Sequence, residues 1–341
     1  MERIGILTGG GDCPGLNAVI RAVVRCASAE GWQVLGFRNG WRGILDDDYI
    51  VLDMQAVSGI LPKGGTILGT SRTNPCKDPK DYEKVKSTFN KHSLGALVAI
   101  GGEDTLGAAS KLYKDGLKVV GVPKTIDNDL NATDYTFGFD TALNIATECI
   151  DRLHTTAESH NRVIVVEIMG RHAGWIALEA GIAGGADVIL IPEVPIEIDW
   201  VCDLIRQRHK KGKTFSIIAI AEGAKLASQD ITLDEKKDQF GHVRLGGVGQ
   251  QVAELIERMT GFETRVTVLG HIQRGGTPTA FDRVLGTRFG VKAVDLVKRG
   301  KFGFMASLQG RNVTEVPLEA AVGELKLVPK EYYEMAKAFF G

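Results

Sequence analysis

Short apolar runs rich in Val and Ile recur along the chain, and most are followed by glycine and then by a longer segment of helical periodicity. Continuous apolar runs of this length are typical of strands buried on both faces of a parallel sheet. They predict strands at residues 3–8, 33–37, 96–100, 118–122, 163–168, 188–191, 215–221 and 264–269. The periodic segments predict helices at residues 15–30, 105–115, 140–159, 175–183, 199–211, 249–260 and 280–298. This alternation indicates an α/β fold with parallel strands.

The length of 341 residues suits two domains or one large α/β unit. Lys and Arg number 41 and Asp and Glu 42, so the net charge of -1 gives no general attraction to nucleic acid or to an anionic membrane. No apolar run approaches the roughly 18 residues that a bilayer-spanning helix needs. The five cysteines are scattered and form no C-x-x-C pair, so their spacing indicates neither a disulfide framework nor a zinc site. We therefore expect a cytoplasmic protein that binds neither nucleic acid nor membranes.

Glycine accounts for 42 residues, an excess that suggests many tight turns or close approaches of the backbone to a ligand. Residues 228–244 form the most charged stretch and are expected to be a solvated loop, with a contact surface as the alternative.

The first glycine motif, T-G-G-G-D-C-P-G at residues 8–15, lies between a predicted strand and a predicted helix. Amide groups of Gly10 and Gly11 at the start of a helix can converge on an anion. A tight strand-to-helix turn without a ligand is the alternative. Cys13 lies within the motif and is expected to be a small filler rather than a reactive thiol.

The second motif, V-A-I-G-G-E-D-T-L at residues 98–106, also leads from a strand into a helix. It places Glu103 and Asp104 where a phosphate-binding loop would otherwise lie. Two carboxylates can hold Mg²⁺, which prefers oxygen ligands. Alternatively, they simply complement the dipole at the start of the helix.

The third motif, G-V-P-K-T-I-D-N-D-L at residues 121–130, is the most informative. If the chain stays extended after the strand, Thr125, Asp127 and Asp129 share one face, with Lys124 beside them. One carboxylate can then deprotonate an alcohol while the other keeps its charge near a metal. An Asx-type turn is the alternative, because D-N-D favours turns.

Several basic side chains follow predicted strands, where ligands bind in open α/β sheets. Arginine suits phosphate because its planar guanidinium donates two parallel hydrogen bonds. Each of these residues would separately suit a surface salt bridge instead. The candidates are Arg72, Arg162, Arg171, Arg265, His271 and Arg274.

Together, these motifs resemble those of the 6-phosphofructokinase family. The resemblance runs over about residues 1–305 and includes G-T-S-R-T, G-G-E-D-T, P-K-T-I-D-N-D, M-G-R-H-A-G-W, I-P-E, A-E-G and L-G-H-I-Q-R-G-G. It implies two doubly wound α/β lobes with the active site in the cleft between them. By this resemblance, residues 1–138 and about 273–323 form a phosphoryl-donor lobe. Residues 139–272 and about 324–341 form a fructose 6-phosphate lobe.

The resemblance also implies roles for individual residues. Asp127 takes the proton from O1 of fructose 6-phosphate, Thr125 and Arg171 steady the phosphoryl group, and Asp129 assists at Mg²⁺. The residues implied to bind the sugar phosphate are Met169, Gly170, Arg171, Glu222, His271 and Arg274. Two more, Arg162 and Arg265, resemble residues that the family supplies from a neighbouring subunit. A homodimer or homotetramer with a shared site is therefore expected.

The donor side departs from the ATP-using pattern, in which glycine replaces both Asp104 and Lys124. Asp104 would lie where the α-phosphate of ATP must pass, and two unit charges 4 Å apart repel by about 4 kcal/mol at an effective dielectric of 20. Lys124 would neutralise charge on a departing phosphate. The resemblance therefore implies the pyrophosphate-dependent branch of the family, with pyrophosphate bound by Gly10, Gly11, Arg72 and Lys124.

Glu103 departs from the aspartate that is common at its position in the family, and it is expected to bind Mg²⁺ directly or through water. Three alternatives remain open at this point. They are an ATP-dependent phosphofructokinase, another kinase with a G-G-[DE]-x-T loop such as an NAD or lipid kinase, and a non-catalytic sensor of sugar phosphates or nucleotides.

Overall fold

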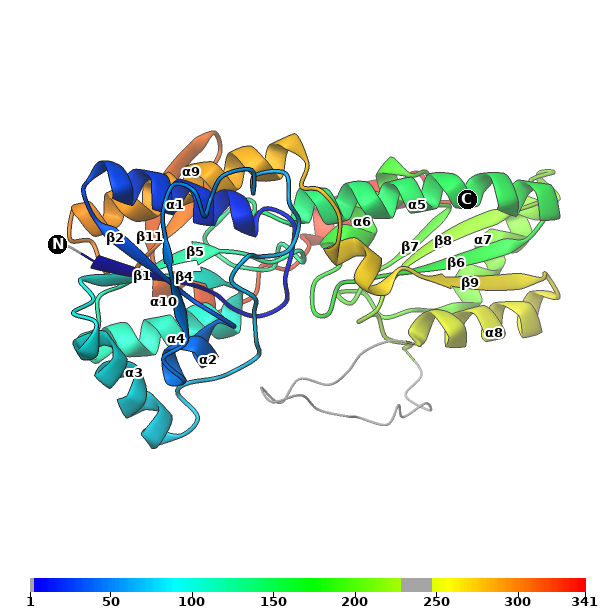
Figure 1. Ribbon diagram of the computed structural model, residues 1–341. Helices are drawn as coiled ribbons and strands as arrows, with labels where there is room; N and C mark the ends of the chain where they lie inside the picture. The colour runs from blue at the N-terminus through cyan, green and yellow to red at the C-terminus, as the bar shows by residue number, and fades with distance from the viewer. Residues whose placement is uncertain (1–2, 228–246) are drawn as a thin grey trace.

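The computed structural model describes residues 3–227 and 247–341, which form two β-sheets covered by helices (Figure 1). The charged stretch at residues 228–244, predicted to be a solvated loop, lies outside the described residues. No helix within the described ranges is long and apolar enough to cross a bilayer.

The first sheet has seven strands in the order β11 (Asn312–Pro317), β10 (Phe304–Gln309), β5 (Val119–Pro123), β4 (Ala96–Gly101), β1 (Arg3–Thr8), β2 (Gln33–Phe37) and β3 (Tyr49–Leu52). The five inner strands are parallel, whereas β3 and β11 pair antiparallel with their neighbours. Every residue of β4 and β5 is buried, as expected for strands covered on both faces.

The second sheet has four parallel strands in the order β7 (Val188–Leu190), β8 (Ser216–Ala221), β6 (Val163–Ile168) and β9 (Thr264–Val268). Its inner strands β6 and β8 are fully buried. The edge strand β9 is not, since Arg265 and Val268 are exposed.

Helices cover both faces of each sheet. On the first sheet, α1 (Leu16–Ala29) and α9 (Ala280–Lys298) lie side by side on one face (Figure 1). The other face carries α2 (Trp41–Leu45), α3 (Pro79–Lys91), α4 (Glu103–Lys114) and α10 (Leu318–Val322).

On the second sheet, α5 (Phe139–His160), α6 (Trp175–Ala183) and α11 (Lys330–Lys337) pack against one face. The opposite face is covered by α7 (Ile198–Lys210) and α8 (Val248–Thr260). The apolar core beneath α1 and α9 continues without a break to the core beneath α5 and α6.

These layers confirm the predicted doubly wound α/β fold, and all eight predicted strands are present. The eight predicted strands pair parallel with one another, whereas β3 and β11, which were not predicted, run antiparallel to their neighbours. The sequence pattern did not reveal β3, β10 and β11, nor the helices α2, α3, α10 and α11. Two of the missed strands are half-exposed edges that lack a continuous apolar run. The proposed boundaries between lobes stay a prediction.

Two glycines in α9 let that helix approach α1 closely, and α1 carries the glycine motif at its start. A Cβ atom at Gly290 would lie 2.7 Å from the Ala22 Cβ atom and 2.8 Å from the Val19 carbonyl oxygen. At Gly286 it would lie 3.0 Å from the Gly15 carbonyl oxygen. The position of the glycine motif therefore depends on this helix pair.

We predict that Gly290→Ala lowers the free energy of unfolding by about 1–3 kcal/mol, because the added methyl group overpacks the α1–α9 contact. Urea denaturation measures this change. The matched control is Gly107→Ala in α4, where no atom lies within 4 Å of the added Cβ atom. That substitution should stabilise the helix by about 0.5–1 kcal/mol. Equal stabilisation by both substitutions would contradict the close helix packing.

Candidate active site

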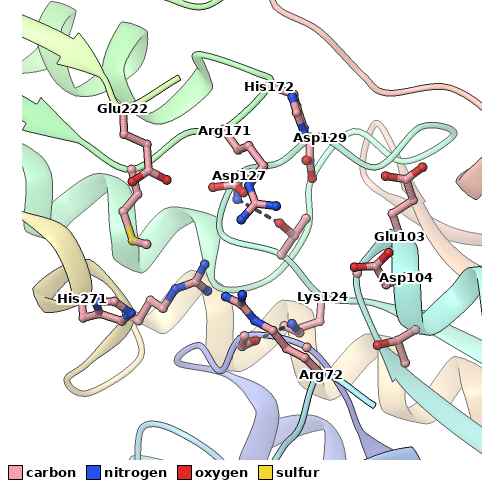
Figure 2. Close-up of a pocket in the computed structure, with 17 residues that line it drawn as sticks. Arg72, Glu103, Asp104, Lys124, Asp127, Asp129, Arg171, His172, Glu222 and His271 are labelled. Atoms are coloured by element: carbon pink, nitrogen blue, oxygen red, sulfur yellow. Dashed lines mark hydrogen bonds between the residues drawn. The ribbon is translucent and has the colours of Figure 1, made fainter. Parts of the chain in front are cut away.

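A cavity of about 590 Å³ gathers most of the predicted site residues (Figure 2). It lies where strands of both sheets end, since Gly10 and Gly11 follow β1, Glu103 follows β4, and Lys124 follows β5. From the second sheet, Met169 and Arg171 follow β6, and Glu222 follows β8. The 3-10 helix η1 (Gly270–Arg274) adds His271 and Arg274. The carboxyl ends of parallel strands are where open α/β sheets bind ligands.

The glycine motif is held by backbone bonds on both sides. Gly9 N–H donates to the Ile100 carbonyl oxygen at 2.9 Å, and Gly10 N–H donates to the Ser71 carbonyl oxygen at 3.2 Å. Gly10 lines the cavity with its N–H bonded to the Ser71 carbonyl oxygen, and its role in holding the donor stays a prediction. At Gly11, a Cβ atom would lie 2.6 Å from an Arg274 guanidinium nitrogen, so a side chain at this position would displace the Arg274 guanidinium group.

Cys13 is buried behind the glycine motif, where its thiol faces the Phe137 carbonyl oxygen at 3.7 Å. Burial raises the pKa of the Cys13 thiol to about 12. A thiol that stays protonated at neutral pH is a poor nucleophile. Cys13 therefore fills space behind the glycine motif and is not a reactive thiol, as predicted.

Lys124 is buried at the end of β5, and its ammonium donates to the Gly11 carbonyl oxygen at 2.5 Å. Burial lowers the pKa of Lys124, and Arg274 acts in the same direction. The Asp12 and Asp127 carboxylates oppose this shift by favouring the charged form. The Lys124 amino group thus lies beside the glycine motif at the wall of the cavity (Figure 2).

The segment after Lys124 is bent rather than extended. Asp127 N–H donates to the Thr125 hydroxyl oxygen at 3.1 Å, and Asn128 has a left-handed φ of 51°. The segment therefore forms a turn, as one of the two interpretations expected. Thr125, Asp127 and Asp129 nevertheless all line the cavity, as expected from the other interpretation. The residues between them, including Asn128, point away and are buried.

Asp129 lies among other carboxylates. Burial raises the pKa of Asp129 to about 7, and the nearby Asp127 and Glu103 carboxylates add to the shift. Burial and Asp127 also raise the pKa of Glu222. A cation would relieve this repulsion. Within residues 3–227 and 247–341, no group of three or more His, Cys, Asp or Glu side chains is placed to hold a metal. Mg²⁺ is usually bound through only one or two protein carboxylates plus substrate phosphates, and Glu103 and Asp129 suit such a site.

On the side of the second sheet, two loops fit closely together. Gly223 N–H donates to the Gly170 carbonyl oxygen at 3.0 Å, and a Cβ atom at Gly223 would lie 1.9 Å from the Arg171 carbonyl oxygen. This contact fixes the backbone on either side of Arg171 and beside Glu222. Gly170 itself is absent from the cavity lining, and its predicted contact with the sugar phosphate stays a prediction.

Two predicted residues, Arg162 and Arg265, do not line the cavity. They lie at the amino-terminal ends of β6 and β9, whereas the cavity lies at the carboxyl ends of the strands. Both form ion pairs with Glu263, and the distance from Arg162 to its carboxylate is 2.8 Å. The resemblance assigned these arginines to a neighbouring subunit's site, and that assignment stays a prediction.

Three residues that line the cavity are absent from the predicted site, namely Gly102, Thr105 and His172. All three lie within motifs that were recognised, G-G-E-D-T and M-G-R-H-A-G. Thr105 is buried, and its hydroxyl lies 2.5 Å from the position of a Cβ atom at Gly9. It therefore packs directly against the glycine motif.

The charges of the cavity are divided between its walls. Four carboxylates lie beside α4 and on the bent segment, those of Glu103, Asp104, Asp127 and Asp129, whereas Glu222 lies across the cavity after β8 (Figure 2). The basic groups are Arg72, Lys124, Arg171, His172, His271 and Arg274. Guanidinium and ammonium groups bind phosphate, and a carboxylate beside a threonine hydroxyl can act as a general base. The arrangement suits phosphoryl transfer between anionic substrates.

Known proteins resemble the chain over nearly its whole length. It is 59% identical to a pyrophosphate--fructose 6-phosphate 1-phosphotransferase of Amycolatopsis methanolica, over 99% of this chain and 100% of the relative. A protein of the same description from Streptomyces coelicolor is 57% identical, with the same coverage. An ATP-dependent 6-phosphofructokinase of Mycobacterium tuberculosis strain H37Rv is 55% identical, over 99% of this chain and 100% of the relative.

Solved structures agree with the fold. A phosphofructokinase of Pichia pastoris in the T-state matches 99% of this chain and 36% of its own, with 32% identity and a TM-score of 0.84. A pyrophosphate-dependent phosphofructokinase of Marinobacter aquaeolei matches 97% of this chain and 86% of its own, with 25% identity and a TM-score of 0.84. The phosphofructokinase family model matches residues 3–297, so the chain belongs to the phosphofructokinase family.

Proposed function

We propose that the protein is a pyrophosphate-dependent 6-phosphofructokinase of the cytoplasm. It transfers a phosphoryl group from pyrophosphate to O1 of fructose 6-phosphate, giving fructose 1,6-bisphosphate and phosphate. The observation that carries the proposal is that Asp104 and the buried Lys124 both line this one cavity, on the side of the glycine motif and α4. Relatives at 57–59% identity are described as pyrophosphate-dependent, which supports the same donor.

Asp127 is the proposed general base. It lies in the cavity beside Thr125 and takes the proton of the O1 hydroxyl as O1 attacks the transferring phosphorus atom. The bond from that phosphorus to the bridging oxygen of pyrophosphate breaks, and phosphate leaves. Thr125 and Arg171 stabilise the charge on the transferring group. Lys124 neutralises the charge that develops on the departing phosphate.

Fructose 6-phosphate would bind on the side of the second sheet. Glu222 and Met169 contact the sugar, and His271 and Arg274 hold its 6-phosphate. The donor lobe would comprise residues 1–138 and about 273–323, and the sugar lobe residues 139–272 and about 324–341. Gly10, Gly11, Arg72 and Lys124 would bind pyrophosphate.

Glu103 and Asp129 would hold Mg²⁺ together with oxygens of the donor. When bound, the ion neutralises charge on the phosphate oxygens. The raised pKa of Asp129 supports this assignment, because a cation would favour the ionised carboxylate.

Selection against ATP is assigned to Asp104. It is exposed in the first turn of α4, so water screens its repulsion of a nucleotide phosphate. Over 4 Å that repulsion lies between about 1 kcal/mol in bulk water and about 4 kcal/mol at a dielectric of 20. The corresponding discrimination lies between about fivefold and about a thousandfold.

An ATP-dependent phosphofructokinase is the second candidate, and relatives described in that way at 54–55% identity favour it. A non-catalytic sensor is disfavoured, because Thr125, Asp127 and Arg171 all line the cavity. Kinases that share only the G-G-[DE]-x-T loop are excluded by the family match over residues 3–297.

A homodimer or homotetramer would complete the site. Arg162 and Arg265 meet at Glu263 on the edge of the second sheet, and the exposed Val268 and Ile272 lie nearby in sequence. In such an oligomer, Arg162 and Arg265 of one subunit would bind the 6-phosphate of the fructose 6-phosphate in the neighbouring subunit's site.

Asp127→Asn is expected to lower kcat by about a hundredfold to ten-thousandfold with little change in KM, because it removes the base without removing a binding contact. A coupled assay of fructose 1,6-bisphosphate formation measures both constants. The exposed Asp151 on α5 provides the control, since Asp151→Asn should leave kcat unchanged. Near-normal kcat in Asp127→Asn would remove the base assignment.

Asp104→Gly is expected to allow turnover of ATP, either alone or with Lys124→Gly. Asp104→Asn separates the two contributions, since it removes the charge but keeps the size of the side chain. If repulsion dominates, Asp104→Asn should gain most of the ATP activity that Asp104→Gly gains. An absence of ATP turnover in the Asp104→Gly/Lys124→Gly double variant would argue against the blocking role.

Arg162→Ala is expected to raise the KM for fructose 6-phosphate far more than it lowers kcat, because it removes a phosphate contact. If the site is shared, mixed oligomers of Arg162→Ala and Asp127→Asn subunits should regain activity at fructose 6-phosphate concentrations far below the raised KM, where each variant alone is nearly inactive. Failure of the mixture to regain activity, with mixed oligomers shown by mass spectrometry, would place each site within one subunit.

A further inference from the structure

The segment between α10 and α11 runs alongside the segment that carries Asp127 and Asp129. We name residues 324–328 the C-terminal strap. Leu325 forms an antiparallel bridge with Leu130, and Lys326 N–H donates to the Asp129 carbonyl oxygen at 2.9 Å. These contacts join the strap to the segment that carries Asp127 and Asp129.

The side chain of Lys326 makes a second connection to the same segment. Its ammonium donates to the Asn128 side-chain oxygen at 3.0 Å, the Thr133 carbonyl oxygen at 2.9 Å and the Asp134 carbonyl oxygen at 2.8 Å. An ammonium has three N–H donors, so these acceptors satisfy all of them. The Asn128 side-chain oxygen also accepts the Thr136 N–H at 3.1 Å.

Asn128 is the residue with left-handed φ between the two carboxylates. Its side chain is buried, whereas those of Asp127 and Asp129 line the cavity. Rotation at Asn128 would therefore swing both carboxylates. The hydrogen bond from Lys326 restrains that rotation from a position outside the cavity lining.

The strap also contacts the segment that carries Arg171. Trp175 indole N–H donates to the Lys326 carbonyl oxygen at 2.8 Å. The Glu193 carboxylate accepts hydrogen bonds from the Val328 N–H at 2.9 Å and from the Gly174 N–H at 3.0 Å. Gly174 and Trp175 come soon after Arg171 at the start of α6. One short strap thus links the loop of the proposed base to the loop of the proposed phosphoryl ligand.

We propose that Lys326 is a positioning residue for phosphoryl transfer. Its ammonium fixes Asn128 and thereby the directions of the Asp127 and Asp129 carboxylates, while its backbone ties this loop to the Arg171 loop. The proposal rests on the proposed function, in which Asp127 is the base and Arg171 binds the phosphoryl group.

The test is Lys326→Met, which removes the three N–H donors but keeps the backbone contacts and most of the side-chain length. We expect kcat to fall by about tenfold to a hundredfold, because small misplacement of a base is costly. The KM for fructose 6-phosphate should stay within about threefold, because Lys326 does not touch the substrate. Lys326→Arg should recover part of kcat. The matched control is Lys330→Met, an exposed lysine four residues further on, which should leave both constants unchanged.

A double-mutant cycle tests the route through Asn128. Asn128→Gly removes the side chain and tolerates the left-handed backbone. If Lys326 acts through Asn128, the Lys326→Met/Asn128→Gly variant should have a kcat within about twofold of Asn128→Gly alone. If the fold losses of kcat in the two single variants multiply in the double variant, the proposed route through Asn128 is overturned.

The proposal would also be overturned by a folded Lys326→Met protein with wild-type kcat, or by equal losses of kcat and substrate binding. If Lys326→Met does not fold, Lys326→Gln takes its place, and failure of both to fold would show a role in folding alone. All variants are assayed with whichever donor the wild type uses. Turnover of ATP alone would therefore refute the proposed donor while the Lys326 comparison still gives its answer.

Discussion

The ammonium of Lys124, buried against the Gly11 carbonyl oxygen, is the charge around which the cavity is arranged. A buried cation is costly unless hydrogen bonds and anions compensate it. The protein supplies one carbonyl group and the nearby Asp12 and Asp127 carboxylates, while Arg274 opposes them with a like charge. A phosphate anion would supply the remaining negative charge. The same reasoning explains why a donor without a nucleoside suits this cavity, since much of its binding free energy must come from contacts with phosphate.

Much of the fold follows from local patterns in the sequence. The inner strands are predictable because burial on both faces requires continuous apolar runs, as in β4 and β6. The edge strands β3 and β11 were missed because their side chains are partly exposed and follow no such run. Their antiparallel direction depends on tertiary pairing, which a local pattern does not encode.

The site was predictable for a different reason. Its residues lie directly after strands, and parallel strands bring their carboxyl ends to one edge, so Gly11, Glu103 and Lys124 meet although they are far apart in the chain. Backbone detail was not predictable. The sequence pattern alone did not reveal the left-handed Asn128, the engaged Gly10 N–H or the contact between Lys326 and Asn128, which are 198 residues apart. These features arise from packing between distant segments.

The proposed roles of Asp104 and Lys124 are tested by the preference of the enzyme for pyrophosphate or ATP. The most direct measurement compares initial rates of fructose 6-phosphate phosphorylation by the wild-type protein with pyrophosphate and with ATP, at equal concentrations of Mg²⁺. We predict a kcat/KM for pyrophosphate that exceeds that for ATP by about a hundredfold, within the range that charge repulsion at Asp104 allows. Rapid phosphorylation from ATP with none from pyrophosphate would contradict the proposed roles of both residues.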